Sequence, residues 1–260
     1  STTQDRDLNE DTMKPLKKIA LVAILSTFLT ACMSTQQINA EASQGYRQMK
    51  QQNAKAIDTS SVTAQRVHKI FNKMKPYAEQ ENKTGVPFQW EITVFRTNEL
   101  NAWAMPGGKM GFYTGLVEKL NMNDDEIATV MGHEMAHALQ EHGKSSRNVT
   151  LITGIVGQVA DAAVTATTGV DTQGLLSVGT DLIANKPFSR SQETEADEVG
   201  LMLMAKSGYN PSAAPNVWVK MSQAGGSGGG IFSTHPSNAD RQKNLERLIP
   251  DAMKLYKAGR

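Results

Sequence analysis

HEMAHALQEHG, residues 133–143, is the stretch of this 260-residue sequence that decides its fold. It begins with two histidines four positions apart, His133 and His137, which lie on one face of an α-helix, a turn apart. Two imidazoles at this spacing can bind one Zn²⁺ ion. Glu134 follows the first histidine and can take a proton from a water molecule that the ion activates. A pair of surface histidines on an amphipathic helix has the same spacing, so the surroundings of the motif decide between the two.

The helix that would carry this motif has its own start signal. Asn123 with Glu126 three residues later is a variant capping box, and the two aspartates that follow Asn123 suit the positive end of a helix. Gly143 is a natural C-terminal stop. We therefore expect a helix over 124–142, and this helical setting favours a metal site.

Zinc needs a third protein ligand, and the candidates lie in SRSQETEADEVG at 189–200. The metzincin arrangement has a further His six residues after the second, but Gly143 occupies that position here. Glu193 and Asp197 are four residues apart and share one face of a helix expected from about 190 to 206. One of them can ligate zinc while the other orients a ligating His. An acidic, solvated helix start is the alternative.

The N-terminal part of the chain carries a second signal, MKPLKKIALVAILSTFLTAC at 13–32. Three lysines precede an apolar run from Ile19 to Leu29, which is too short for an ordinary membrane span but typical of a secretory signal. The run ends in LTAC, which resembles a bacterial lipobox, so we expect cleavage before Cys32 and lipid on its thiol. A short buried helix is the alternative. Residues 1–12 are polar, and we expect them to be an upstream extension outside the fold.

Composition and periodicity outline the rest of the chain. Residues 32–60 are rich in Gln, Ser, Asn and Ala and predict a tether, whereas 61–260 predict one domain that opens with a helix. Alternating apolar residues within 90–114 predict three strands of a small, largely antiparallel sheet. Residues 148–184, rich in Val, Ala, Thr and Gly, fit buried helices, a mobile cover or a membrane-contacting segment.

Composition also excludes several classes of function. The 27 Lys and Arg residues stand against 26 Asp and Glu, a net charge of +1, so nucleic acid is not an expected partner, since phosphate binding needs a basic excess. A single Cys excludes a disulfide framework and a multi-cysteine zinc site. The hydrophobic content of 39% and charged content of 20% are typical of a folded chain.

Four blocks of sequence together resemble one zinc metallopeptidase family. The blocks are NELNAWAMPGGKMGFYTGLVEKL at 98–120, HEMAHALQEHG at 133–143, SRSQETEADEVG at 189–200 and STHPSNADRQ at 233–242. The family includes the CAAX prenyl endopeptidases, the HtpX heat-shock protease and the mitochondrial Oma-type proteases. The resemblance is greatest to its soluble bacterial lipoprotein members, and the blocks occur in the family's order.

The resemblance implies a role for each matching residue. The implied ligands of one zinc ion per chain are His133, His137 and Glu193. Glu193 is preferred to Glu195 because the family pattern is ExxxD. Glu134 would be the general base. The implied supporting residues are Asp197, Arg241 and His142.

Two further features follow from the resemblance. His235 would stabilise the oxyanion or, in a resting state, reach the zinc position, with a simple helix cap as the alternative. In zincins an edge strand beside the zinc helix pairs with the extended substrate, and the strand implied here is Asn101, Ala102, Trp103 and Ala104. A plain core hairpin fits the same alternation. We also expect Gly200 to let its helix approach the zinc helix closely.

We therefore expect an α+β, mainly helical, gluzincin-like zincin domain with a small antiparallel sheet beside the HExxH helix. The expected protein is a zinc endopeptidase, lipid-anchored on the periplasmic side of a bacterial envelope, and Met33 after Cys32 favours the outer membrane. Expected substrates are unfolded or damaged envelope proteins, and envelope proteases or assembly machinery are candidate partners. The rival functions are a latent or chaperone-like zinc-binding lipoprotein and a structural zinc protein with a closed four-ligand site.

Overall fold

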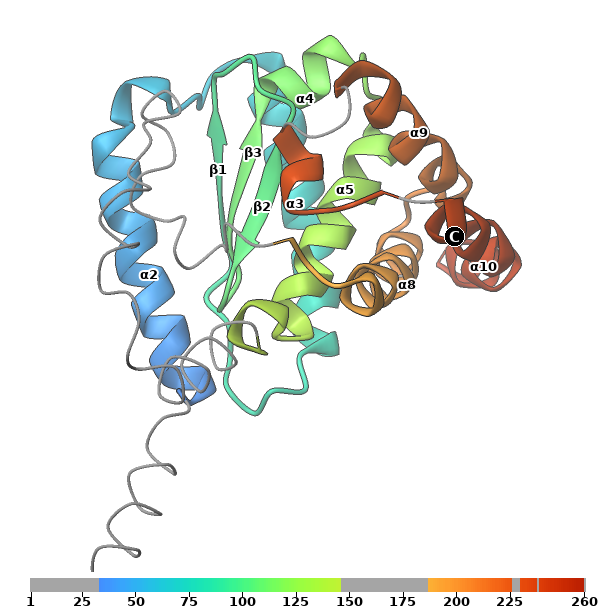
Figure 1. Ribbon diagram of the computed structural model, residues 1–260, viewed down its shortest axis with the longest axis horizontal. Coiled ribbons are helices and arrows are strands. Elements are labelled where there is room, and N and C mark those ends of the chain that lie inside the picture. Colours follow the sequence, from blue (N-terminus) through green and yellow to red (C-terminus); the bar gives the residue numbers. More distant parts are fainter. Residues whose placement is uncertain (1–32, 146–186, 226–229, 238, 260) are drawn as a thin grey trace, which may run out of the picture.

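The computed structural model describes residues 33–145, 187–225, 230–237 and 239–259 (Figure 1). The expected upstream extension, the secretory signal, Cys32 and the segment 148–184 lie outside these ranges. Among the helices that are described, each is too short or too polar to cross a lipid bilayer.

A three-stranded sheet in the order β1-β3-β2 forms the centre of the fold (Figure 1). Its strands are β1 (Glu91–Phe95), β2 (Ala102–Met105) and β3 (Lys109–Tyr113). The hairpin of β2 and β3 is antiparallel, but β1 pairs with β3 in parallel. The sheet is therefore mixed, and the prediction of an antiparallel sheet is wrong for β1. After β1 the chain forms β2 at the far edge of the sheet. The hairpin then places β3 between β2 and β1, antiparallel to β2 and parallel to β1.

Helix α2 (Thr35–Gln52) stands where the sequence predicted a tether, and it covers one face of the sheet (Figure 1). A capping box between Ser34 and Gln37 starts it. Its buried face packs against the sheet in a cluster that consists of Ala42, Tyr46, Met49, Phe95, Trp103, Met105 and Tyr113. The aromatic Tyr46 is fully buried, and its hydroxyl bonds to Thr93 and to the carbonyl of Met110. From Thr35 to Gln52 the chain is thus a packed layer of the domain.

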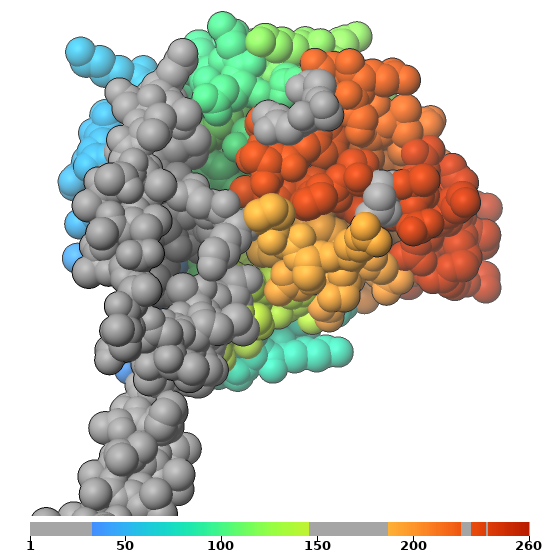
Figure 2. Space-filling model, viewed as in Figure 1, coloured from blue at the N-terminus to red at the C-terminus, as the bar shows by residue number. Residues whose placement is uncertain are grey.

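The remaining helices build the larger core on the other face of the sheet. They are α3 (Val62–Glu81), α4 (Thr114–Lys119), α5 (Asp124–Leu139), α8 (Arg190–Lys206), α9 (Ala214–Gly225) and α10 (Ala239–Ala258), with short 3-10 turns η1 (Ala54–Ala56), η2 (Pro211–Ala213) and η3 (Gly230–Ser233). Figure 2 shows the segments after residue 187, coloured yellow to red, gathered on one side of the molecule.

Helix α5 carries the HExxH motif and starts as predicted, with the capping box of Asn123 and Glu126. Its end differs from the prediction. Gln140 is the C-cap, and Glu141 has a positive φ of 53°, so the helix stops before Gly143 because a left-handed residue cannot continue it.

Helices α5 and α8 approach each other through two glycines. A Cβ on Gly200 would lie 2.7 Å from the backbone nitrogen of His133, and one on Gly132 would lie 2.6 Å from the carbonyl oxygen of Gly200. Both distances are shorter than any side chain tolerates. The expected close approach at Gly200 is confirmed, and it brings α8 directly against the start of the histidine motif.

Candidate metal centre

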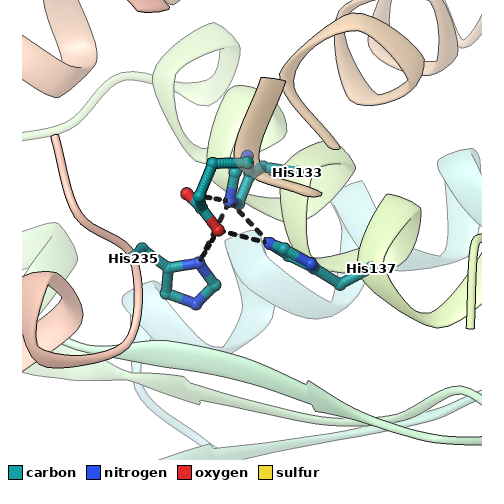
Figure 3. Close-up of side chains that lie close together, drawn as sticks. His133, His137 and His235 are labelled. Atoms are coloured by element: carbon teal, nitrogen blue, oxygen red, sulfur yellow. Dashed lines mark hydrogen bonds and ion pairs between the residues drawn. The ribbon is translucent and has the colours of Figure 1, made fainter. Parts of the chain in front are cut away.

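Four buried side chains from three parts of the chain converge on one point. His133 and His137 come from α5, Glu193 from the first turn of α8, and His235 from the segment after η3. One nitrogen or oxygen of each lies within 4.8 Å of the others. Figure 3 shows the three imidazoles turned toward this point. The structure thus brings together the three ligands expected from the sequence and adds His235 as a fourth group.

The distances within this cluster leave room for a cation and little else. Nε2 of His137 lies 2.9 Å from Oε1 of Glu193, and Nε2 of His133 lies 3.4 Å from Oε2. Nδ1 of His133 donates to Oδ1 of Asp197 at 2.9 Å, because a carboxylate only accepts. Burial alone would lower the pKa of His133, but the charges and hydrogen bonds of Glu193 and Asp197 raise it. In its neutral, metal-binding form the ring has a lone pair on Nε2, which faces Glu193. Lone pairs that face one another in a buried site fit a metal ion, and two histidines with one glutamate are a donor set of catalytic zinc.

Asp197 and Arg241 form a second layer of contacts around the cluster. Arg241 donates to both carboxylate oxygens of Asp197, from Nε at 2.7 Å and from Nη2 at 2.8 Å. Burial alone would raise the pKa of Asp197, but hydrogen bonds from Arg241 and His133 lower it below its usual range. Nη1 of Arg241 also donates to the carbonyl of Pro236 at 2.7 Å, which fixes the segment that carries His235. Both residues therefore stand where the sequence expected supporting groups.

Glu134 lies beside the cluster without joining it. Its Oε1 is buried, makes no hydrogen bond within the described residues and lies 3.2 Å from Nε2 of His235. Burial is the largest cause that raises the pKa of Glu134 to about 7. A carboxyl group with a pKa near neutrality can both take and return a proton, as a general base must.

Two aromatic residues of the site escaped the sequence reasoning. The ring of Phe188 stacks on His137 at a centroid distance of 3.9 Å, and its backbone N–H bonds to the carbonyl of Thr234. Trp218 of α9 packs edge-on against His133 at 4.7 Å and beneath the Arg241 guanidinium at 4.6 Å. Phe188 directly precedes the SRSQETEADEVG block, so its position could have indicated that it lies near the site. Nothing in the sequence around Trp218 distinguishes it from an ordinary core residue.

The expected substrate strand lies at the edge of the sheet, next to α5. Its side chains alternate: Trp103 points into the cluster under α2, while Ala102 and Ala104 pack with the larger core. Trp103 therefore belongs to the core, and only its backbone is available to a peptide. The carbonyl of Leu100, just before the strand, accepts a hydrogen bond from Ile231 at 2.8 Å.

A small cavity lies between this strand and His137. It measures about 10 Å³ and is lined by residues that include Ala104, Met105, His137 and Phe188. A space of this size holds about one water molecule.

Comparison with known proteins places these residues in a wider group. The model of the family described as peptidase family M48 matches residues 61–249. The mitochondrial metalloendopeptidase OMA1 of Arabidopsis thaliana is 34% identical over 186 residues, which cover 70% of this chain and 36% of the relative. OMA1 of Schizosaccharomyces pombe is 35% identical over 167 residues, 63% of this chain and 48% of the relative. The metalloprotease LoiP of Escherichia coli is 26% identical over 255 residues, 92% of this chain and 99% of the relative. The chain thus spans between about a third and a half of these OMA1 relatives.

Proposed function

Since the chain belongs to peptidase family M48, we propose that it is a zinc-dependent endopeptidase whose metal is held by His133, His137 and Glu193. The observation that carries the proposal is the convergence of these three buried donors beside Glu134, a carboxyl group with a pKa of about 7. The metalloendopeptidases and the metalloprotease that match the chain support the same activity.

The residues of the site divide the work of hydrolysis. Zinc, when bound, supplies a Lewis acid that polarises the scissile carbonyl and makes water acidic enough to attack near neutral pH. Glu134 takes the proton of the attacking water and returns it to the leaving amine. His235 presents Nε2 toward Glu134 and stabilises the oxyanion by donating a hydrogen bond. β2, an outer strand of the sheet, holds the peptide in an extended form by main-chain hydrogen bonds.

A latent enzyme is the second candidate, and the position of His235 favours it. Nδ1 of His235 lies 2.9 Å from Oε1 of Glu193 and 3.2 Å from Nε2 of His133, so this nitrogen would be a fourth donor to a bound ion. An ion held by four protein donors would have no open position for the attacking water. Peptidase activity then requires the segment that carries His235 to move.

Proteolysis of an unfolded protein such as casein tests both candidates. The purified chain should cleave casein, lose the activity with a chelator and regain it with zinc. Glu134→Gln should keep the zinc and lose roughly 10²–10⁴-fold in rate. A Glu134→Gln variant that cleaves at the wild-type rate would refute the assignment of the base. An inactive wild type with an active His235→Ala variant would establish the latent enzyme instead.

The cellular setting of the proposal rests on the N-terminal sequence. The LTAC motif before Cys32 supports lipid anchoring on the periplasmic side of the envelope, with the outer membrane as destination and unfolded or damaged envelope proteins as substrates. Proteases and assembly factors of the envelope are the proposed partners. Metabolic labelling with radioactive palmitate should label the wild type and not Cys32→Ser, and Cys32→Ser should leave the membrane fraction. Equal labelling of both would exclude Cys32 as the acceptor.

A further inference from the structure

A row of hydrogen bonds leads from the metal centre to the surface of α8. Nδ1 of His137 lies 2.8 Å from Nδ1 of His142, and Nε2 of His142 lies 2.8 Å from Oε2 of Glu195. His137 and His142 are buried, while the side chain of Glu195 is 50% exposed. The row therefore joins a buried metal ligand to a carboxylate that reaches solvent.

The carboxylate at the outer end sets the direction of every hydrogen bond in this row. A carboxylate only accepts, so Nε2 of His142 carries the proton that it donates to Glu195. In its neutral form, His142 then has a lone pair on Nδ1, and that nitrogen accepts. The proton between the two rings then belongs to Nδ1 of His137. This leaves Nε2 of His137 able to bind a metal ion, whereas without an ion the carboxylate of Glu193, 2.9 Å away, competes for a proton on Nε2.

We propose that Glu195 is a positioning residue, which acts through His142 to hold His137 in the tautomer that binds metal. The inference rests on the proposed zinc site. It gives His137 an acidic partner equivalent to the one that His133 has in Asp197. Both acids belong to α8, but position 195 lies away from the face shared by positions 193 and 197. An intervening imidazole is therefore needed to connect Glu195 with His137.

The unusual end of α5 supplies that imidazole. Glu141 adopts a left-handed conformation with φ 53°, which is costly for a residue other than glycine. This turn brings His142 back beneath His137, five positions earlier, where a continuing helix would carry it away. The Glu141 side chain is held in turn by Thr35, whose hydroxyl donates to it, and by Lys144, whose ammonium lies 3.7 Å away. The strained turn thus has a function, which is to place His142 between the ligand and Glu195.

The experiment compares Glu195→Ala with Glu198→Ala, which removes a charge from the same helix at a partly exposed side chain bonded to Asn244. Zinc affinity is measured by competition with a chromophoric chelator. The tautomer of His137 is read, without metal, from ¹⁵N-histidine NMR spectra. Glu195→Ala should bind zinc about tenfold more weakly, the lower end of the range for lost outer partners of metal ligands. Its His137 should shift toward the tautomer protonated on Nε2, which the carboxylate of Glu193 favours, while Glu198→Ala should match the wild type in both measurements.

A conservative variant distinguishes the loss of the hydrogen bond to His142 from a general disturbance of the fold. Glu195→Gln keeps an oxygen that can accept from His142, so it should recover most of the affinity and the wild-type tautomer. The proposal is overturned if Glu195→Ala retains the wild-type tautomer and affinity, or if Glu195→Gln recovers neither. A wild type that binds no zinc would refute the proposed function, whereas the NMR comparison on the metal-free chain would still decide the role of Glu195.

Discussion

Replacing Gly200 by alanine should pull the metal centre apart without replacing any of its ligands. The new Cβ would lie 2.7 Å from the backbone of Gly132 and His133, where ordinary contacts begin at 3.4 Å. The two helices must therefore separate by roughly 0.7 Å, and both sides of the contact are backbone, which cannot swing away. Metal–ligand distances tolerate only about 0.2 Å. Glu193 on α8 would then no longer reach an ion that the α5 histidines hold.

The substitution changes the free energy of unfolding and the free energy of zinc binding by different amounts, and each can be measured separately. Overpacking costs roughly 1–3 kcal/mol of unfolding free energy, and the better helix propensity of alanine offsets about 1 kcal/mol of it. The metal-free variant should therefore unfold at a slightly lower urea concentration than the wild type. Its zinc affinity should fall at least about tenfold, which corresponds to roughly 1.4 kcal/mol. Chelator competition for zinc and urea unfolding without zinc give the two quantities.

Gly259→Ala is the matched control, because a Cβ at this exposed glycine meets nothing closer than 3.8 Å. It should leave both zinc affinity and stability unchanged. If Gly200→Ala binds zinc as tightly as the control does, then the close backbone approach of α5 and α8 does not set the geometry of the metal centre, and the reasoning fails.

Three further predictions concern parts of the structure around the site. Arg241→Met leaves the buried carboxylate of Asp197 without its cation and should cost roughly 3–5 kcal/mol in urea unfolding; a loss below 1 kcal/mol would mean that the pair is dispensable. Tyr46→Ala should cost roughly 3–5 kcal/mol, since it empties a buried aromatic site under α2, and a negligible loss would restore the view of this region as a tether. For Asp58, burial alone would raise the pKa, but hydrogen bonds from Ser61 and Arg96 lower it to about 2. A folded-state pKa below the usual 3.8 stabilises the protein above pH 4 and stops doing so as the pH falls toward 2. Asp58→Asn should therefore be less stable than the wild type by roughly 1 kcal/mol at pH 7, and most of this difference should be lost as the pH falls through about 2; a constant difference across this range would contradict the shift.

The chemistry of the site was predictable because it depends on short spacings. Helical periodicity alone places His133 and His137 together, and the same period pairs Glu193 with Asp197 on one face of α8. The meeting of α5 with α8 was expected only through Gly200 and the family resemblance. His235 was expected only through the family resemblance, and which of its nitrogens lies beside Glu193 required the structure.

The helix α2 shows where composition misled the prediction. Its abundance of Gln, Ser and Asn suggested a tether, yet Ile38, Ala42, Tyr46 and Met49 recur at three- and four-residue steps along one face. This spacing of apolar residues is typical of a helix that packs against a core. The parallel pairing of β1 with β3 had no such signal, because strand order depends on contacts between residues distant in sequence.

The start of α2 limits how far the domain can move from Cys32. A tether over 32–60 would span on the order of 100 Å and let the proposed metal centre sample a wide volume. In the chain only Met33 and Ser34 separate Cys32 from α2, a span of at most about 11 Å, and Thr35 is bonded to Glu141 just after α5. The proposed lipid on Cys32 would then leave little slack between bilayer and domain. Substrates of such an anchored peptidase would have to diffuse to the membrane surface, and the rate of encounter would follow their concentration at that surface.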